Sequence, residues 1–182
     1  MQSLRLSHEK MQEIVDHAKN AFPNEACGLI AGLEGQASEI IAIKNIAENP
    51  QAHYMMDANE QLQALKHFDN QGIEWLGVYH SHPNSKPIPS LEDIDSAELN
   101  TSNLCHVIVG LEHQKVTLQA WHIHNGEVNP VEILIGQQES YSIAPMSKVQ
   151  IWAIILAIII GIILLLLMSF SLLPPAPPIP TP

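Results

Sequence analysis

One stretch of the chain decides where its chemistry lies and how the fold is built around it: HSHPNSKPIPSLED, residues 80–93. If the apolar segment 75–80 runs as a strand, side chains two apart leave the same face, so His80 and His82 can present both imidazoles to one metal ion. The prolines after them exclude regular structure, because proline lacks a backbone N–H and has a fixed φ. The sequence therefore predicts a strand that ends in two metal ligands.

A helix is expected to begin at the other end of this stretch, at Ser90. A serine suits an N-cap because its hydroxyl accepts a hydrogen bond from a backbone N–H of the first turn. Asp93 lies one turn further on, and residues three apart share a helix face, so its carboxylate can point into the same cleft and act as the third ligand. Two imidazoles and one carboxylate leave the fourth position of a tetrahedral Zn²⁺ to water, as in catalytic zinc sites.

A zinc site of this kind also needs an acid/base. Bound zinc lowers the pKa of its water to about 7, but a carboxylate must still accept the proton and pass it to the leaving amine. Our candidate is Glu25, far upstream of the histidines. Taken alone, Glu25 can equally be an exposed acid near the start of a strand.

This spacing resembles that of the JAMM (MPN-plus) metalloprotease family, in which a distant Glu precedes His-x-His, seven residues, Ser, two residues and Asp. Every position is matched, and the segment 25–30, EACGLI, looks like the family's strand with the general base. The resemblance covers about residues 1–135. It implies that His80, His82 and Asp93 bind one zinc ion with a bound water, that Glu25 is the acid/base and that Ser90 helps to stabilise the tetrahedral oxyanion.

The same residue types allow other interpretations. A second His-x-His, His122-Ile123-His124, precedes Asn-Gly, a hairpin turn signal, and has no Ser-x-x-Asp after it. Ser90 can be a helix cap and nothing more. Cys27 lies near Glu25, but no neighbouring residue in the sequence lowers its pKa, so we expect a buried thiol rather than a nucleophile.

Composition narrows the classes of function. The chain has 182 residues and a formal net charge of −11, and all its charged residues precede Ile151. An acidic domain is a poor match for nucleic-acid phosphates or an anionic lipid surface, so no nucleic-acid partner is expected. Two cysteines give neither a Cys-x-x-Cys pair nor a disulfide framework, which favours a reducing compartment.

The C-terminal part differs from the rest. Residues 151–173 are uncharged and almost wholly apolar, long enough as a helix to cross the roughly 30 Å hydrocarbon layer. We expect a linker over 136–150, a transmembrane helix over 151–173 and a Pro-rich tail over 174–182. The N-terminus lacks the apolar segment of a signal peptide, so the expected arrangement is a single-pass C-terminal anchor with a cytoplasmic catalytic domain.

The remaining patterns predict an α/β domain over residues 1–135. Apolar residues at helical spacing predict one helix between Ser7 and Pro23 and another over 59–70. Strands are predicted over 26–33, 39–45, 75–80, 104–111, 116–122 and 128–135. These elements indicate a mixed, mostly antiparallel curved sheet flanked by helices. The family resemblance implies the same, a JAMM-type α-β-α sandwich.

The expected function is that of a membrane-anchored zinc metallopeptidase. The family resemblance implies hydrolysis of a peptide or isopeptide bond after the C-terminus of a ubiquitin-like or sulfur-carrier protein, by zinc-activated water with Glu25 as general base. Two alternatives stay open from the sequence. One is a non-catalytic MPN scaffold that binds a protein partner at the membrane, and the other is a sulfur-carrier peptidase in cofactor or cysteine synthesis.

Overall fold

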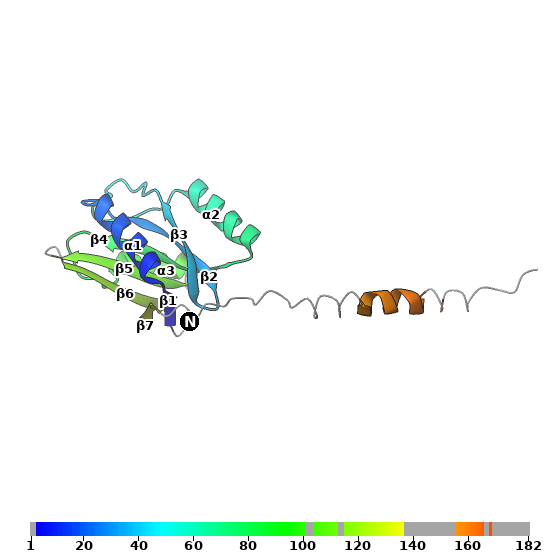
Figure 1. The fold of residues 1–182 in the computed structure, drawn as a ribbon. Coiled ribbons are helices and arrows are strands. Elements are labelled where there is room, and N and C mark those ends of the chain that lie inside the picture. The colour runs from blue at the N-terminus through cyan, green and yellow to red at the C-terminus, as the bar shows by residue number, and fades with distance from the viewer. Residues whose placement is uncertain (1–2, 101–103, 113–114, 137–155, 166–167, 169–182) are drawn as a thin grey trace, which may run out of the picture. The chain divides into compact units, whose positions relative to one another are not determined.

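The computed structural model describes residues 3–100, 104–112, 115–136, 156–165 and 168 of the chain (Figure 1). The chain divides into two compact units, residues 1–139 and residues 140–182. The first unit contains a single sheet and, among its described residues, three helices.

Seven strands form the sheet of the first unit, in the order β1-β3-β2-β4-β5-β6-β7, and the sheet closes into a barrel. The strands are β1 Ser3–Leu6, β2 Cys27–Leu33, β3 Gln36–Ile43, β4 Glu74–His82, β5 Cys105–Glu112, β6 Lys115–His124 and β7 Glu127–Ile135. Four strand pairs are antiparallel, whereas β4 with β5 and β1 with both β3 and β7 are parallel. The sheet is therefore mixed and mostly antiparallel, as predicted.

The closed barrel differs from the predicted sandwich, and the short strand β1 is the reason. It pairs with β7 over its whole length and meets β3 at the single position Arg5↔Gln36. Its Leu4 and Leu6 are fully or almost fully buried, so it is fixed by the core as well as by its pairing. Four residues are too short for a convincing alternating pattern, and the sequence therefore did not predict the strand that closes the sheet.

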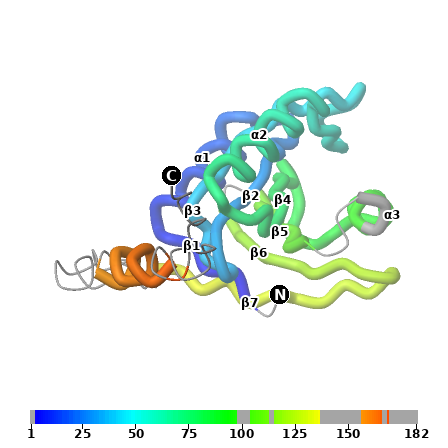
Figure 2. The backbone as a smooth tube through the Cα atoms, turned by 90° about the vertical axis from the view of Figure 1, so that its right-hand side faces the viewer, coloured from blue at the N-terminus to red at the C-terminus, as the bar shows by residue number. Residues whose placement is uncertain are grey.

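Helices α1 His8–Ala21 and α2 Ala58–Gln71 cover opposite faces of the sheet. Ile14 of α1 packs with Ile30 of β2 and Tyr79 of β4. Phe68 of α2 packs with Val78, the residue that precedes Tyr79 on β4. Successive side chains of a strand point to opposite faces, so the two clusters are on the two sides of one sheet. The third helix, α3 Leu91–Asn100, stands apart from both (Figure 2).

Local sequence explains where the helices begin and end. Ser7 caps α1 by accepting from Lys10 N at 3.1 Å. Asp57 caps α2 by accepting from two backbone N–H groups, and α2 ends at Gly72, whose positive φ of 67° suits glycine. All the predicted helices and strands of the first unit are present, with ends shifted by a few residues.

In the second unit the structure describes residues 156–165 and 168, which are helical. Among the described residues, no helix has both the length and the apolar character needed for a membrane crossing. The expected linker after Gly136, the Pro-rich tail and most of the expected span over 151–173 lie outside the described residues.

Candidate metal centre

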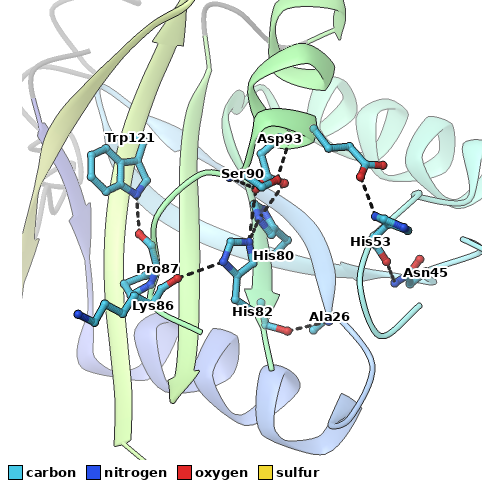
Figure 3. Close-up of polar contacts among 12 residues, drawn as sticks. Ala26, Asn45, His53, His80, His82, Lys86, Pro87, Ser90, Asp93 and Trp121 are labelled. Atoms are coloured by element: carbon cyan, nitrogen blue, oxygen red, sulfur yellow. Dashed lines mark hydrogen bonds and ion pairs between the residues drawn. The ribbon is translucent and has the colours of Figure 1, made fainter. Parts of the chain in front are cut away.

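Strand β4 and helix α3 bring the three predicted ligands together, as Figure 3 shows. The Nε2 atoms of His80 and His82 are 3.1 Å apart. Asp93 places Oδ1 3.2 Å from His80 Nε2 and Oδ2 3.4 Å from His82 Nε2. All three side chains are buried. Among the described residues, this is the one group of three or more His, Cys, Asp or Glu side chains whose ligand atoms lie close enough together to share a metal ion.

These distances test whether the residues fit zinc. A tetrahedral ion with ligands at about 2.0–2.1 Å requires ligand atoms roughly 3.3–3.4 Å apart. The two Nε2 atoms are 3.1 Å apart, and each lies near a different oxygen of Asp93, His80 near Oδ1 at 3.2 Å and His82 near Oδ2 at 3.4 Å. With one ligand atom taken from each residue, all three atoms lie within 4.8 Å of one another. Two imidazole nitrogens and one carboxylate are also the donor set of many catalytic zinc sites, so the residues fit the ion.

Burial and neighbouring charges act on the protonation of these ligands. Burial lowers the pKa of His80 despite the nearby Asp93 carboxylate. Burial alone would raise the pKa of Asp93, but its hydrogen bonds with His80, His82 and Ser90 hold that pKa well below its usual range. Burial lowers the pKa of His82, but Asp93 outweighs this and the net pKa is raised. Metal binding at this cluster competes with protons for the same ring nitrogens and is therefore expected to depend on pH.

Asp93 is fixed by Ser90 through reciprocal capping at the start of α3. The Ser90 backbone N–H and its hydroxyl each donate to Asp93 Oδ2 at 2.7 Å, and Ser90 Oγ accepts from Asp93 N at 3.1 Å. The predicted cap is therefore confirmed. In this structure the Ser90 hydroxyl donates its only proton to the Asp93 carboxylate. A hydrogen bond from Ser90 to an oxyanion would therefore require the hydroxyl to turn away from Asp93.

The loop between β4 and α3 fixes His82. The His82 Nδ1 lies 3.1 Å from the Lys86 carbonyl oxygen, and Trp121 Nε1 on β6 donates to the Pro87 carbonyl at 2.9 Å. Gly110 on β5 lets this loop approach, since an added Cβ there would lie 2.7 Å from the Ser85 carbonyl oxygen. Trp121 and Gly110 belong to no motif around the histidines, so sequence reasoning did not find them.

Glu25 is buried two residues before the start of β2 and lines the same cleft as His82 and Asp93. Burial is the main reason that its pKa is raised to about 7, with Asp93 adding to the effect and His82 opposing it. A carboxyl with a pKa near 7 is suited to both accepting and returning a proton. The interpretation of Glu25 as an exposed acid is therefore wrong.

Ser81, between the two histidines, connects the ligand strand to the Glu25 segment. Its Oγ accepts from Ala26 N at 2.9 Å, and its backbone N–H donates to Ala26 O at 3.0 Å. Ser81 is fully buried and points to the face opposite the histidines. The serine therefore holds the residue next to Glu25 at a fixed distance from the metal ligands.

The cleft lies between two walls. One wall is formed by residues 51–54 of the loop after β3, and the other by residues 83–85 and 90 of the loop after β4 with the start of α3. His53 Nδ1 and Glu92 Oε2, at 2.7 Å, join the two walls (Figure 3). The sequence assigned no role to the first wall, because that loop contains no recognised motif.

The other candidates play no part in this cleft. The rings of His122 and His124 on β6 are 6.1 Å apart and have no third ligand in the described part of the chain. Cys27 is buried, its thiol donates to Ile43 O, and burial raises its pKa to about 12. A protonated, buried thiol is a poor nucleophile, so the expectation for Cys27 is confirmed.

Comparisons with known proteins agree with the motif. The family described as prokaryotic homologs of the JAB domain matches residues 7–124. A desampylase from Haloferax volcanii is 33% identical over 101 residues, 52% of this chain and 72% of that protein. A CysO-cysteine peptidase from Mycobacterium tuberculosis is 28% identical over 127 residues, 69% of this chain and 86% of that protein.

A solved structure extends the likeness to the fold. The solution structure of a protein from Desulfitobacterium hafniense is 34% identical, covers 72% of this chain and 92% of its own, and superposes with a TM-score of 0.66. The family match spans more than half of the chain and includes every residue of the metal cluster. The chain therefore belongs to the prokaryotic homologs of the JAB domain, a JAMM-type family, and is a hydrolase of that type.

Proposed function

We propose that the protein is a zinc metallopeptidase that hydrolyses a peptide or isopeptide bond after the C-terminus of a ubiquitin-like or sulfur-carrier protein. The observation that carries the proposal is the cluster of His80, His82 and Asp93, of which His82 and Asp93 line one cleft together with Glu25. The names of the similar desampylase and CysO-cysteine peptidase support this class of substrate.

Five residues of the site have distinct roles in this reaction. His80, His82 and Asp93 would hold one zinc ion, which when bound supplies a Lewis acid and a water of lowered pKa. Glu25 accepts a proton from water and donates it to the leaving amine, a cycle that a carboxyl with a pKa of about 7 can complete at neutral pH. Ser90 keeps the Asp93 carboxylate in place through its two short hydrogen bonds.

The full-length protein, loaded with one equivalent of zinc, tests the proposal on a ubiquitin-like protein fused through its C-terminus to a reporter. We expect cleavage directly after the ubiquitin-like C-terminus, loss of cleavage with a chelator and recovery on adding zinc. Zinc binding without cleavage of any ubiquitin-like or sulfur-carrier fusion would oppose the proposed substrate class. Failure to bind zinc would oppose the metallopeptidase and favour the scaffold interpretation.

We also propose that residues 151–173 anchor the protein in a membrane, with the catalytic domain on the cytoplasmic side. The support is the sequence: the segment is uncharged, and the only nearby basic residue, Lys148, precedes it. Expression of the full chain with a tag at each end tests both the membrane anchor and the orientation of the catalytic domain. We expect the protein in the alkali-washed membrane fraction, with the catalytic domain digested by protease added from the cytoplasmic side. Recovery in the wash would contradict the anchor.

A further inference from the structure

The two histidines of the metal centre are held in different ways. His82 has its second ring nitrogen, Nδ1, 3.1 Å from the Lys86 carbonyl oxygen. The Nδ1 of His80 is buried and is the one buried side-chain polar atom in the described part of the chain without a hydrogen-bond partner. A metal-binding histidine usually donates its second N–H to a carboxylate or carbonyl, which fixes the orientation of the ring. His80 therefore needs another restraint.

That restraint is an aromatic ring from the opposite wall of the cleft. The ring of Tyr54 stacks on the His80 imidazole, with centroids 4.5 Å apart and an angle of 21° between the planes. A ring that lies flat on the imidazole opposes its rotation about the Cβ–Cγ bond, because a turned imidazole would strike it. The contact thus keeps His80 Nε2 directed at His82 and Asp93, which lie 3.1 and 3.2 Å away.

Tyr54 is itself held firmly, because the side chain of Asn45 brackets it. Asn45 Nδ2 donates to the carbonyl of His53, and Asn45 Oδ1 accepts from the N–H of Met55, both at 3.0 Å. The same Nδ2 donates to the carbonyl of Glu25 at 3.0 Å. One amide therefore fixes the backbone on both sides of Tyr54 and the backbone of the proposed acid/base.

We propose that Tyr54 is a positioning residue for the metal centre, and that its stacked ring holds His80 in the absence of a hydrogen bond to Nδ1. This inference rests on the proposed zinc site. The ring and not the hydroxyl carries the effect, so an aromatic replacement keeps the function and an aliphatic one loses it.

Two variants of the full-length protein test this: Tyr54→Phe, which keeps the ring, and Tyr54→Leu, which removes it. Zinc affinity is measured by competition with a chromophoric chelator. Loss of a group that orients a metal ligand typically weakens metal binding by about 10- to 100-fold, and we expect this for Tyr54→Leu. We expect Tyr54→Phe to bind within about threefold of the unaltered protein, by the same principle.

Two further measurements separate orientation from general damage. Thermal unfolding of the metal-free proteins shows whether Tyr54→Leu is folded. NMR of the unaltered zinc-loaded protein reports the stack directly, since the ring protons of His80 should be shifted upfield by the Tyr54 ring current, and those of His82 should not. This second measurement needs no variant, so an absent shift would overturn the inference even if Tyr54→Leu does not fold.

The outcomes are distinct. Weaker zinc binding in Tyr54→Leu alone, together with upfield-shifted His80 ring protons, supports the inference. Unchanged zinc affinity in a folded Tyr54→Leu, equal losses in both variants, or His80 ring protons without the shift would overturn it and leave the zinc site intact. Absence of zinc binding in the unaltered protein would overturn the proposed function and this inference together.

Discussion

Two His-x-His segments of the same sheet, one on β4 and one on β6, have identical local spacing and different surroundings. The first places His80 and His82 in a buried cluster with Asp93. The second leaves His122 half-buried and His124 exposed. Because His80 is in register with Ile108 whereas His122 is in register with Cys105, the two pairs point to opposite faces of the sheet.

The two pairs also differ in the segment that comes next along the chain. After the β4 pair, the loop 83–90 returns to deliver α3 and its carboxylate. After the β6 pair, Asn125 and Gly126, both with positive φ, turn the chain directly into β7. Two imidazoles on one strand thus make a metal centre only when the topology supplies a third ligand and shields all three from solvent.

The largest effect is expected on removing a ligand. Asp93→Ala should abolish zinc retention and reduce peptidase activity to background, because two histidines cannot hold a catalytic zinc alone. The paired variant His122→Ala should retain as much zinc and as much peptidase activity as the unaltered protein. Metal content after dialysis and the fusion-cleavage rate are the measurements. Loss of zinc in His122→Ala would remove the contrast between the two segments.

Next in size is the loss of the acid/base. Glu25→Gln should bind zinc normally and lower kcat by about 10²- to 10⁴-fold, the usual contribution of a positioned general base. The matched change near the second pair is Glu127→Gln, since Glu127 is the cross-strand partner of His124. Steady-state kinetics with zinc-loaded proteins compares the two. Equal activity in both variants would show that Glu25 is not the base.

A methyl group at Gly110 should have an intermediate effect. The added Cβ would lie 2.7 Å from Ser85 O and 2.8 Å from the Pro87 ring, so the loop that orients His82 must shift. Because displacements of about 1 Å near a reaction centre can reduce rates about 10²-fold, we expect Gly110→Ala to lower kcat by roughly 10- to 100-fold. Gly161→Ala is the control, since nothing lies within 4 Å of a Cβ added there.

The middle residues of the two segments allow a comparison of stability. Ser81→Ala leaves the buried N–H of Ala26 without its acceptor, which should reduce the free energy of unfolding by about 1–3 kcal/mol. Ile123 is equally buried but apolar, and Ile123→Val should cost about 0.5–1.5 kcal/mol. Urea unfolding measures both. Of these two variants, only Ser81→Ala should also lower kcat, because Ser81, unlike Ile123, contacts the segment beside Glu25.

A histidine outside both segments should give the smallest effect. His17 accepts or donates a hydrogen bond at Tyr79 Oη, 2.8 Å away, and burial lowers its pKa below 6.5. His17 therefore binds a proton more readily in the unfolded chain than in the folded protein. The stability that His17 contributes is present above about pH 6.5 and is lost as the pH falls through the lowered pKa of the folded protein. The side chain is half-buried, so the change should stay below about 1 kcal/mol.

The measurement is the difference in unfolding free energy between the unaltered protein and His17→Gln from pH 7.5 to pH 5. This difference should shrink as the pH falls. A difference that is constant over this range, or one that grows toward acid, would contradict the lowered pKa of His17.

The sequence predicted the metal cluster well because its geometry is local. Alternation along one strand places His80 and His82 together, and a helix cap places Asp93 beside Ser90, so short-range rules suffice. Glu25 needed the family resemblance, since no local rule relates it to residues some fifty positions away.

The parts that were missed depend on long-range contacts. Tyr54 lies in a loop without periodicity and Asn45 at the end of a predicted strand, and no pattern in the sequence relates either of them to His80. The Ser81 contact to Ala26 spans 55 positions, and the closure of the barrel depends on the four residues of β1. Such contacts follow from the topology of the sheet, which hydrophobic patterns alone do not determine.

The contact between His53 and Glu92 bears on how the proposed polypeptide substrate would reach the metal centre. It joins the two walls at 2.7 Å, yet both side chains are largely open to solvent, at 45% and 61% exposure. Contacts of this kind contribute at most about 1 kcal/mol. Breaking the contact should therefore cost little, so we expect an incoming chain end of the proposed substrate to meet only a weak barrier between the two walls.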